Sequence, residues 1–110
     1  MKIAVPTNGN KGLEETVADH FGRCATYTFL NEDGRVTGTI KGGHEQLPPQ
    51  LLKQHGADLV LCKSLGSKAI DLCNKLGIQV YVIPANTVKE IFNAWKNESI
   101  RPAAKEDACD

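Results

Sequence analysis

Residues 58–83, DLVLCKSLGSKAIDLCNKLGIQVYVI, contain two apolar segments separated by an amphipathic one. Asp58–Cys62 and Val80–Ile83 are short and almost continuously apolar, which is typical of strands covered on both faces. Between them, Gly66–Leu76 carries an apolar stripe at helical spacing, ahead of a stop at Gly77: Ala69, Ile70, Cys73 and Leu76. The order strand, helix, strand predicts two parallel strands joined by a right-handed crossover.

Two further helices flank this unit. Upstream, Pro48 and Pro49 suit the first turn of a helix that we expect to end at Gly56. Downstream, Asn86 or Thr87 can cap a helix whose apolar stripe consists of Val88, Ile91, Phe92 and Trp95. From residue 48 onward the predicted order is helix, strand, helix, strand, helix, which is typical of an α/β fold.

The front of the chain adds one strand and a hairpin. The β-branched run Lys2–Val5 predicts a strand that ends at Pro6. Ala25–Leu30 and Arg35–Lys41 favour strands, and the turn formers of Asn31–Gly34 predict that they pair as an antiparallel hairpin. The simplest assembly is one mixed five-stranded sheet with helices on its faces.

The composition narrows the class of protein. The 110 residues fit one domain, and 41% apolar with 24% charged residues is an ordinary globular mixture. Basic and acidic side chains number 13 each and no basic run occurs, so we expect no nucleic-acid partner. No apolar run approaches the roughly 18 residues of a membrane span, and no signal-peptide core precedes the first strand. We therefore expect a cytoplasmic protein without a membrane partner.

The four cysteines are spaced too widely for a zinc ribbon or a redox dithiol: Cys24, Cys62, Cys73 and Cys109. In a reducing cytosol they are expected to be free thiols. Cys73 belongs to the apolar stripe of its helix and is expected to act there as a small hydrophobic residue. The spacing leaves open metal ligands that are gathered from separate loops.

Two segments concentrate the residues with useful chemistry. The first wall is Asp19–Cys24 (DHFGRC), after the first strand and its loop, and the second wall is Cys62–Ser67 (CKSLGS), at the end of the fourth strand. In an open α/β sheet, ligands bind beyond the carboxyl ends of the strands. If the first and fourth strands are neighbours, both walls lie at that edge, with Thr7 and Asn8 beside them. The residues alone do not give this strand order.

The second wall suits an anion. Gly66 and Ser67 begin a helix whose first N–H groups and positive dipole end attract negative charge, and Lys63 or Lys68 can add a cation. In the alternative interpretation, Ser64 or Ser67 is only a helix cap. Capping alone is the commoner role for such a serine.

The first wall suits a metal or an anion. His20 and Cys24 are four residues apart and would share a face if the segment were helical, giving two ligands for iron or zinc. Two ligands do not make a site, and a histidine near a cysteine is more often structural. Arg23 beside Gly22 suits a ligand with anionic atoms, but it would equally suit a surface salt bridge.

Two more residues are candidate ligands. His44, in a glycine-rich connection, can hold an imidazole over a cleft or can be an ordinary solvated loop residue. Cys62 is either the last buried residue of its strand or the first residue of the site.

The sequence lacks the parts of common enzyme sites. It has no nucleophile elbow, phosphate-binding loop or dinucleotide-binding turn. A small thiol hydrolase could be assembled from Cys24 or Cys62 with His20 or His44, but nothing in the spacing requires it.

Four blocks of the chain resemble one known family. They are the opening Met1–Thr7, the His20-Phe21-Gly22-Arg23 block before an aromatic strand, the helix start Leu65–Ala69, and the strand entry Gly77–Tyr81. Together they resemble the dinitrogenase iron-molybdenum cofactor biosynthesis family of small proteins that bind and carry iron-sulfur cofactor precursors. The resemblance covers residues 1–98 as one domain and leaves 99–110, which has no periodicity, as a C-terminal tail.

The resemblance implies a fold and a cargo. The fold is a ribonuclease H-like sheet with strand two antiparallel and strand order 3-2-1-4-5, which would make strands one and four neighbours. The cargo is an anionic iron-sulfur or iron-molybdenum-type cluster, bound reversibly by a few His or Cys contacts and by backbone N–H and Arg donors. Many members carry a loop rich in His, Gly and Cys after strand three, whereas this chain has Gly42-Gly43-His44 followed by no cysteine.

These observations lead to ranked hypotheses. The first is a non-enzymatic carrier of a metal cluster, related to nitrogen fixation by family, with cluster donor and acceptor proteins as partners. Its metal contacts are His20, Cys24, His44 and Cys62, and its other cofactor contacts are Thr7, Asn8, Gly22, Arg23, Ser64, Gly66, Ser67 and Lys68. The second is a binding module for a small phosphorylated or other anionic ligand, and a thiol hydrolase is third. We expect a monomer or a weak homodimer that pairs through the edge strand Arg35–Lys41.

Overall fold

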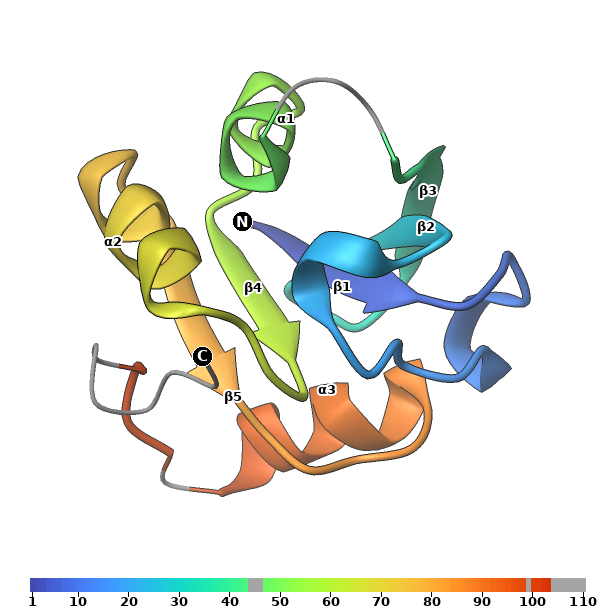
Figure 1. Cartoon of the computed structure of the whole chain (residues 1–110). Helices are drawn as coiled ribbons and strands as arrows, with labels where there is room; N and C mark the ends of the chain where they lie inside the picture. The colour runs from blue at the N-terminus through green and yellow to red at the C-terminus, as the bar shows by residue number, and fades with distance from the viewer. Residues whose placement is uncertain (44–46, 99, 104–110) are drawn as a thin grey trace.

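The computed structural model describes residues 1–43, 47–98 and 100–103 of the chain. They form a five-stranded mixed sheet made of β1 (Lys2–Thr7), β2 (Thr26–Asn31), β3 (Val36–Lys41), β4 (Leu59–Cys62) and β5 (Gln79–Val82). The strand order is β3-β2-β1-β4-β5 (Figure 1). β1 and β3 are antiparallel to β2, whereas β1, β4 and β5 are mutually parallel. The predicted sheet, its order and its antiparallel second strand are confirmed.

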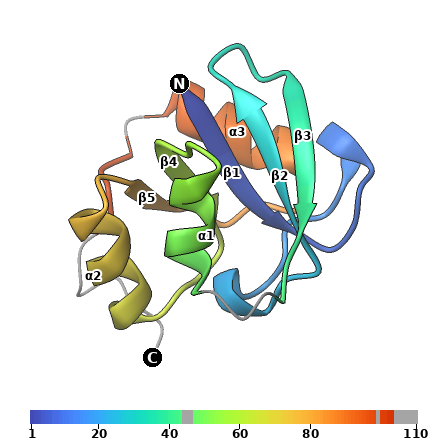
Figure 2. The same cartoon turned by 90° about the horizontal axis from the view of Figure 1, so that it is seen from above.

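The described residues also form three helices and two short 3-10 turns. They are α1 (Pro48–Gln54), α2 (Ser67–Lys75), α3 (Val88–Asn97), η1 (Gly12–Glu14) and η2 (Phe21–Arg23). Of these, α3 follows the last strand and the others lie between strands. α1 and α2 cover one face of the sheet and α3 covers the other, as the view from above shows (Figure 2). Each face has its own apolar core, with Leu52, Ile70 and Cys73 on the α1–α2 side and Ile91 and Phe92 on the α3 side.

The first strand is longer than predicted. β1 continues through Pro6 to Thr7, and Pro6 lies opposite Tyr27 of β2. Proline is tolerated here because the ladder with β4 involves only Ile3 and Ala4, so the missing N–H removes no bond to that strand. Its carbonyl still accepts a hydrogen bond from the N–H of Ala18 at 2.9 Å.

The hairpin turn and the helix cap follow their predicted chemistry. The Asn31 side-chain oxygen accepts hydrogen bonds from the N–H groups of Asp33 and Arg35, at 2.9 and 3.0 Å. Gly34 has φ +85° and faces the Phe92 ring, which would lie 2.7 Å from a Cβ at that position. Only glycine satisfies both conditions. Thr87 caps α3 through a reciprocal capping box with Glu90.

The described part of the C-terminal segment is ordered against the sheet. Ala103 is buried, and its N–H donates a hydrogen bond of 2.6 Å to the carbonyl of Val80 on β5. Ala103 is therefore packed against the edge strand β5, within the segment that the sequence analysis assigned to a C-terminal tail. Across the described ranges, no helix has the length and apolar character needed to cross a bilayer.

Candidate functional site

The two walls meet in space because β1 and β4 are parallel neighbours. Their carboxyl ends lie at one edge of the sheet, and the connections that leave them run to opposite sides. The Ser64 hydroxyl donates a hydrogen bond of 2.7 Å to the carbonyl of Asp19, and the Phe21 N–H donates one of 3.2 Å to the carbonyl of Ser64. Lys63 adds an ion pair to the Asp19 carboxylate at 3.5 Å. These bonds join the first wall directly to the second.

A pocket of about 720 Å³ lies where the walls meet. Its volume is in the usual range for small-molecule and cofactor sites. The first wall contributes His20, Phe21, Gly22 and Arg23; the second wall and the first turns of α2 contribute Ser64, Leu65, Gly66, Ser67, Lys68, Ala69 and Leu72; and the start of α1 contributes Leu47, Pro48 and Pro49.

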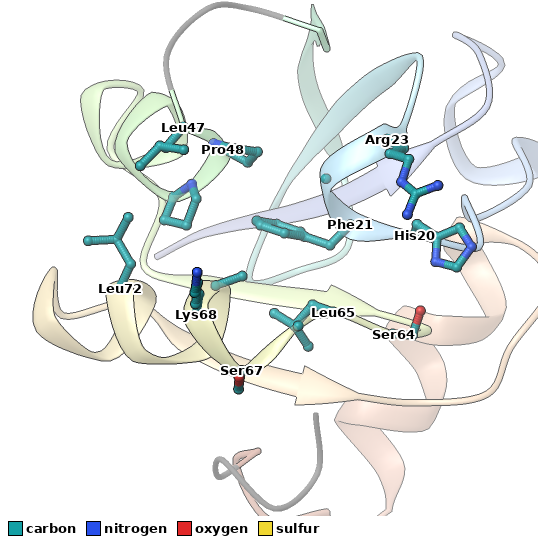
Figure 3. A pocket seen from close by; sticks show the side chains of 14 residues that line it. His20, Phe21, Arg23, Leu47, Pro48, Ser64, Leu65, Ser67, Lys68 and Leu72 are labelled. Atoms are coloured by element: carbon teal, nitrogen blue, oxygen red, sulfur yellow. The ribbon is translucent and has the colours of Figure 1, made fainter. Parts of the chain in front are cut away.

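The ionisable groups that line the pocket are basic. His20 and Arg23 lie at one end and Lys68 lies at the other, with the ring of Phe21 between them (Figure 3). No carboxylate is among the described lining residues. The α2 helix begins in the same place, and its N-cap, Gly66, has no side chain that could accept from the first N–H groups. The pocket therefore favours a ligand with negative charge.

Ser64 lines the pocket and makes a contact that the sequence analysis did not predict. Its hydroxyl ties the second wall to Asp19, and the N-cap of α2 is Gly66. Ser64 is thus a bridge between the walls, which neither of the two interpretations of the sequence included.

Tyr27 fixes the position of η2. Its hydroxyl donates a hydrogen bond of 2.7 Å to the carbonyl of Phe21, and the two rings meet edge to face with centroids 5.8 Å apart. Tyr27 is buried on β2 and belongs to the α1–α2 core. Burial raises its pKa, so the hydroxyl stays protonated and remains a donor. The sheet thereby positions the residues of the first wall.

His20 and Cys24 do not share a face. Both have extended backbone conformations, and only the three residues between 20 and 24 form the short 3-10 turn η2. His20 is exposed at the pocket, while Cys24 is buried in the α1–α2 core. Burial raises the pKa of the Cys24 thiol, which disfavours the thiolate that a metal would need. The sequence analysis considered a helical segment in which His20 and Cys24 share one face. The structure has no such helix, so this arrangement is ruled out.

Cys62 and Cys73 are also core residues. Neither has any exposed surface, and neither lines the pocket. Burial raises the pKa of each thiol from 9.0 to about 12. Cys62 is thus the last buried residue of its strand, and Cys73 is the small hydrophobic residue that the sequence predicted. Among the described residues, no group of three or more His, Cys, Asp or Glu is arranged to hold a metal ion.

Two other predicted contacts, Thr7 and Asn8, lie away from the pocket. Thr7 is fully buried, and its hydroxyl lies 3.0 Å from that of Thr28, while the Asn8 side chain donates to Thr16. Neither lines the pocket. His44 lies outside the residues that the structure describes.

Gly22 leaves the pocket open on the first wall. A Cβ built at this position would meet nothing within 4 Å, and its φ is not in the left-handed region. The fold around it therefore does not require glycine. What the missing side chain provides is an uncovered backbone at the pocket surface, where a ligand can approach closely.

The sequence analysis missed the apolar side of the pocket, above all Leu47, Pro48 and Pro49. Leu47 is 56% exposed, which is unusual for a leucine beside a helix start. A topological signal for this side exists: α1 precedes a strand parallel to β1, so α1 must begin at the carboxyl edge, where the walls lie. The proline pair also removes two N–H donors, which makes this side apolar.

The fold and the pocket together define a small α/β domain with a basic pocket at the switch point of a ribonuclease H-like sheet. Residues 1–98 match the family model described as dinitrogenase iron-molybdenum cofactor. The chain belongs to this family.

Three known proteins are similar to this chain, one in sequence and two in fold. An uncharacterised protein of Methanocaldococcus jannaschii is 26% identical over 105 residues, covering 86% of this chain and 85% of that protein. The apo form of the orange protein from Desulfovibrio gigas is 23% identical with a TM-score of 0.80, covering 94% and 92% of the two chains. A NifB-like protein from Thermotoga is 24% identical with a TM-score of 0.75, covering 92% and 91%. The two solved structures support the fold.

Proposed function

We propose that the chain is a non-enzymatic carrier that binds an anionic iron-sulfur or iron-molybdenum-type cluster reversibly in the pocket. The observation that carries the proposal is the meeting of the two walls around a cavity whose lining ionisable groups are basic. Membership of the dinitrogenase iron-molybdenum cofactor family supports the kind of cargo. A carrier of this kind requires one partner protein that donates the cluster and another that accepts it.

The donors in the pocket suit loose binding. Arg23 and Lys68 supply charge, the first turn of α2 supplies N–H groups, and His20 offers one imidazole ligand. The described thiols are buried behind the lining and do not reach the cavity. The apolar side suits sulfide, which is a weak hydrogen-bond acceptor. A cargo held mainly by charge and shape can be handed over without breaking protein–sulfur bonds.

Binding of tetrathiomolybdate under anaerobic conditions tests this proposal. We expect a change in its visible absorption with one equivalent of protein, and an at least tenfold weaker Kd after Arg23→Gln and Lys68→Gln together. Lys75→Gln is the matched control, because Lys75 is exposed in the last turn of the same helix, outside the pocket. Equal weakening by the control substitution, or no binding by the parent protein, would contradict the proposal.

One observation favours a second candidate function, a binding module for a small phosphorylated anion. No described cysteine lines the pocket, and the N–H, guanidinium and ammonium donors there would serve any compact anion. Competition separates the two. Inorganic phosphate that displaces tetrathiomolybdate at equal concentration favours the module, whereas selective retention of the sulfide anion favours the carrier.

A further inference from the structure

The pocket has an apolar end as well as a basic one. Seven of its 14 lining residues have apolar side chains. Leu47, Pro48 and Leu72 lie on one side of the Phe21 ring, and Arg23 lies on the other (Figure 3). The two ends of the cavity therefore offer different chemistry to a ligand that spans it.

The apolar end is a poor place for a purely inorganic anion. The side chains of Leu47, Pro48 and Leu72 have no hydrogen-bond donor, and a proline has no backbone N–H. An anion that entered this end would lose its water and gain few donors in return, which is unfavourable. Lys68 is exposed on the same side, and its charge disfavours a cationic group there. A neutral hydrocarbon or aromatic group suits this end best.

The size of the cavity also fits a ligand with an organic body. Its volume of about 720 Å³ is in the range that holds drug-sized organic molecules. A single tetrathiomolybdate ion is much smaller and would leave the apolar end unfilled. The large hydrophobic residues that are exposed within the described part of the chain are Met1, Val36 and Leu47, and of these only Leu47 lines the pocket. A ligand that covers Leu47 removes its apolar surface from water.

We propose that the pocket also binds a small organic anion, with its acidic group at Arg23 and its hydrocarbon or aromatic body against Leu47, Pro48 and Leu72. The proposal rests on the proposed function in that both use the basic end of the pocket. The organic anion and the cluster therefore exclude one another. A bound organic anion lowers the apparent affinity for the cluster by the fraction of molecules in which the pocket is free.

Two sulfonates test the apolar end in the metal-free full chain. Methanesulfonate and naphthalenesulfonate carry the same charge and differ in the size of their apolar body. Burial of a large apolar group tightens binding roughly 10- to 100-fold, so we expect naphthalenesulfonate to bind at least about tenfold more tightly. Amide shifts at Gly22, Arg23, Leu65 and Leu72 should give a single Kd. A smaller difference in Kd, or shifts that lie away from the pocket, would overturn the proposal.

One substitution locates the apolar body. Leu47→Ser removes apolar surface and should reduce the preference for naphthalenesulfonate over methanesulfonate about threefold or more. Leu47 is the N-cap of α1, where serine is a favoured residue, so the fold is preserved. Val36→Ser is the matched control, because Val36 is also an exposed hydrophobic residue but lies on β3, outside the pocket. Equal effects of the two substitutions on the preference would refute the assigned position of the body.

A second substitution locates the acidic group. Arg23→Gln should weaken both sulfonates by the same factor, because both place their charge at the guanidinium. Loss of binding for naphthalenesulfonate alone would contradict this orientation.

Competition separates this proposal from the carrier role. Saturating naphthalenesulfonate should raise the apparent Kd of tetrathiomolybdate, and simultaneous binding of both would refute a shared site. Tetrathiomolybdate binding without the preference between sulfonates would overturn only the organic ligand. The sulfonate preference without tetrathiomolybdate binding would overturn only the carrier.

Discussion

The hydroxyl of Tyr27 is predicted to hold the first wall in place, and Tyr27→Phe removes that single group. The substitution keeps the ring that packs edge to face against Phe21 and deletes the donor to the Phe21 carbonyl, which lies 2.7 Å away. Tyr27 and Phe21 are each 2% exposed, so water cannot readily replace the donor. An unsatisfied buried acceptor costs about 1–3 kcal/mol.

The stability of this variant gives the first readout. For a domain of this size, each kcal/mol lowers Tm by roughly 4–8 °C. We therefore expect Tyr27→Phe to lower Tm by at least about 4 °C in a thermal melt followed by circular dichroism. Tyr81→Phe is the matched control, because Tyr81 is only partly buried and no hydrogen bond of its hydroxyl is found within the described residues.

Binding gives the second readout. Tyr27 does not line the pocket, so a weaker Kd for tetrathiomolybdate in Tyr27→Phe would arise from displacement of η2. We expect a three- to tenfold loss, measured at a temperature where the variant is fully folded. A Tm equal to that of Tyr81→Phe, together with an unchanged Kd, would refute the role given to this hydrogen bond.

Three further predictions test other parts of the site and core. Gly22→Ala should leave the free energy of unfolding unchanged or raise it by about 0.4–1 kcal/mol. It should nevertheless weaken tetrathiomolybdate binding, because the new Cβ enters open space at the pocket. Gly38→Ala is the control: its Cβ also meets nothing within 4 Å, but Gly38 lies on β3 away from the pocket, so binding should not weaken. Gly42→Ala should lower the free energy of unfolding in urea by about 1–3 kcal/mol, since its Cβ would collide with the backbone carbonyl of Cys24. Burial raises the pKa of the Cys62 thiol from 9.0 to about 12 in the folded protein. Between these two pH values the thiol is ionised in the unfolded chain and still protonated in the folded one. The stability that this thiol contributes below pH 9 is therefore lost as the pH rises to 12. Cys62→Ala should flatten that decline by up to about 1.4 kcal/mol per pH unit, and an unchanged slope would contradict the burial of this thiol.

The sequence predicted the sheet because its signals are local and agree with one another. Continuous apolar runs marked β4 and β5, and the stop at Gly77 has the left-handed φ of +78° that such a stop needs. The sequence analysis ended the first strand at Pro6, whereas β1 continues to Thr7. A proline can either end a strand or occupy a strand position that forms no ladder on one side, and the sequence does not distinguish the two. The position of β1 next to β4 came only from the family resemblance, since strand order depends on contacts between distant residues.

The candidate site was only partly predictable, because residue types can be read from the sequence but side-chain direction and contacts between distant residues cannot. The sequence identified both walls by their residue types, and the parallel β1–β4 pair brings them together. It could not show that η2 is a tight turn that exposes His20 and buries Cys24, because side-chain direction depends on backbone angles that spacing alone does not fix. The contribution of Leu47 and the proline pair required the whole fold, since α1 reaches the pocket only through its position on the sheet.

The most direct test of the two-walled anion pocket is an anaerobic titration of the ¹⁵N-labelled chain with tetrathiomolybdate, followed by amide resonances. The account predicts that Gly22 and Arg23 on one wall and Gly66 and Lys68 on the other shift together, with a single Kd. Shifts on one wall alone, or at lysines away from the pocket, would contradict it.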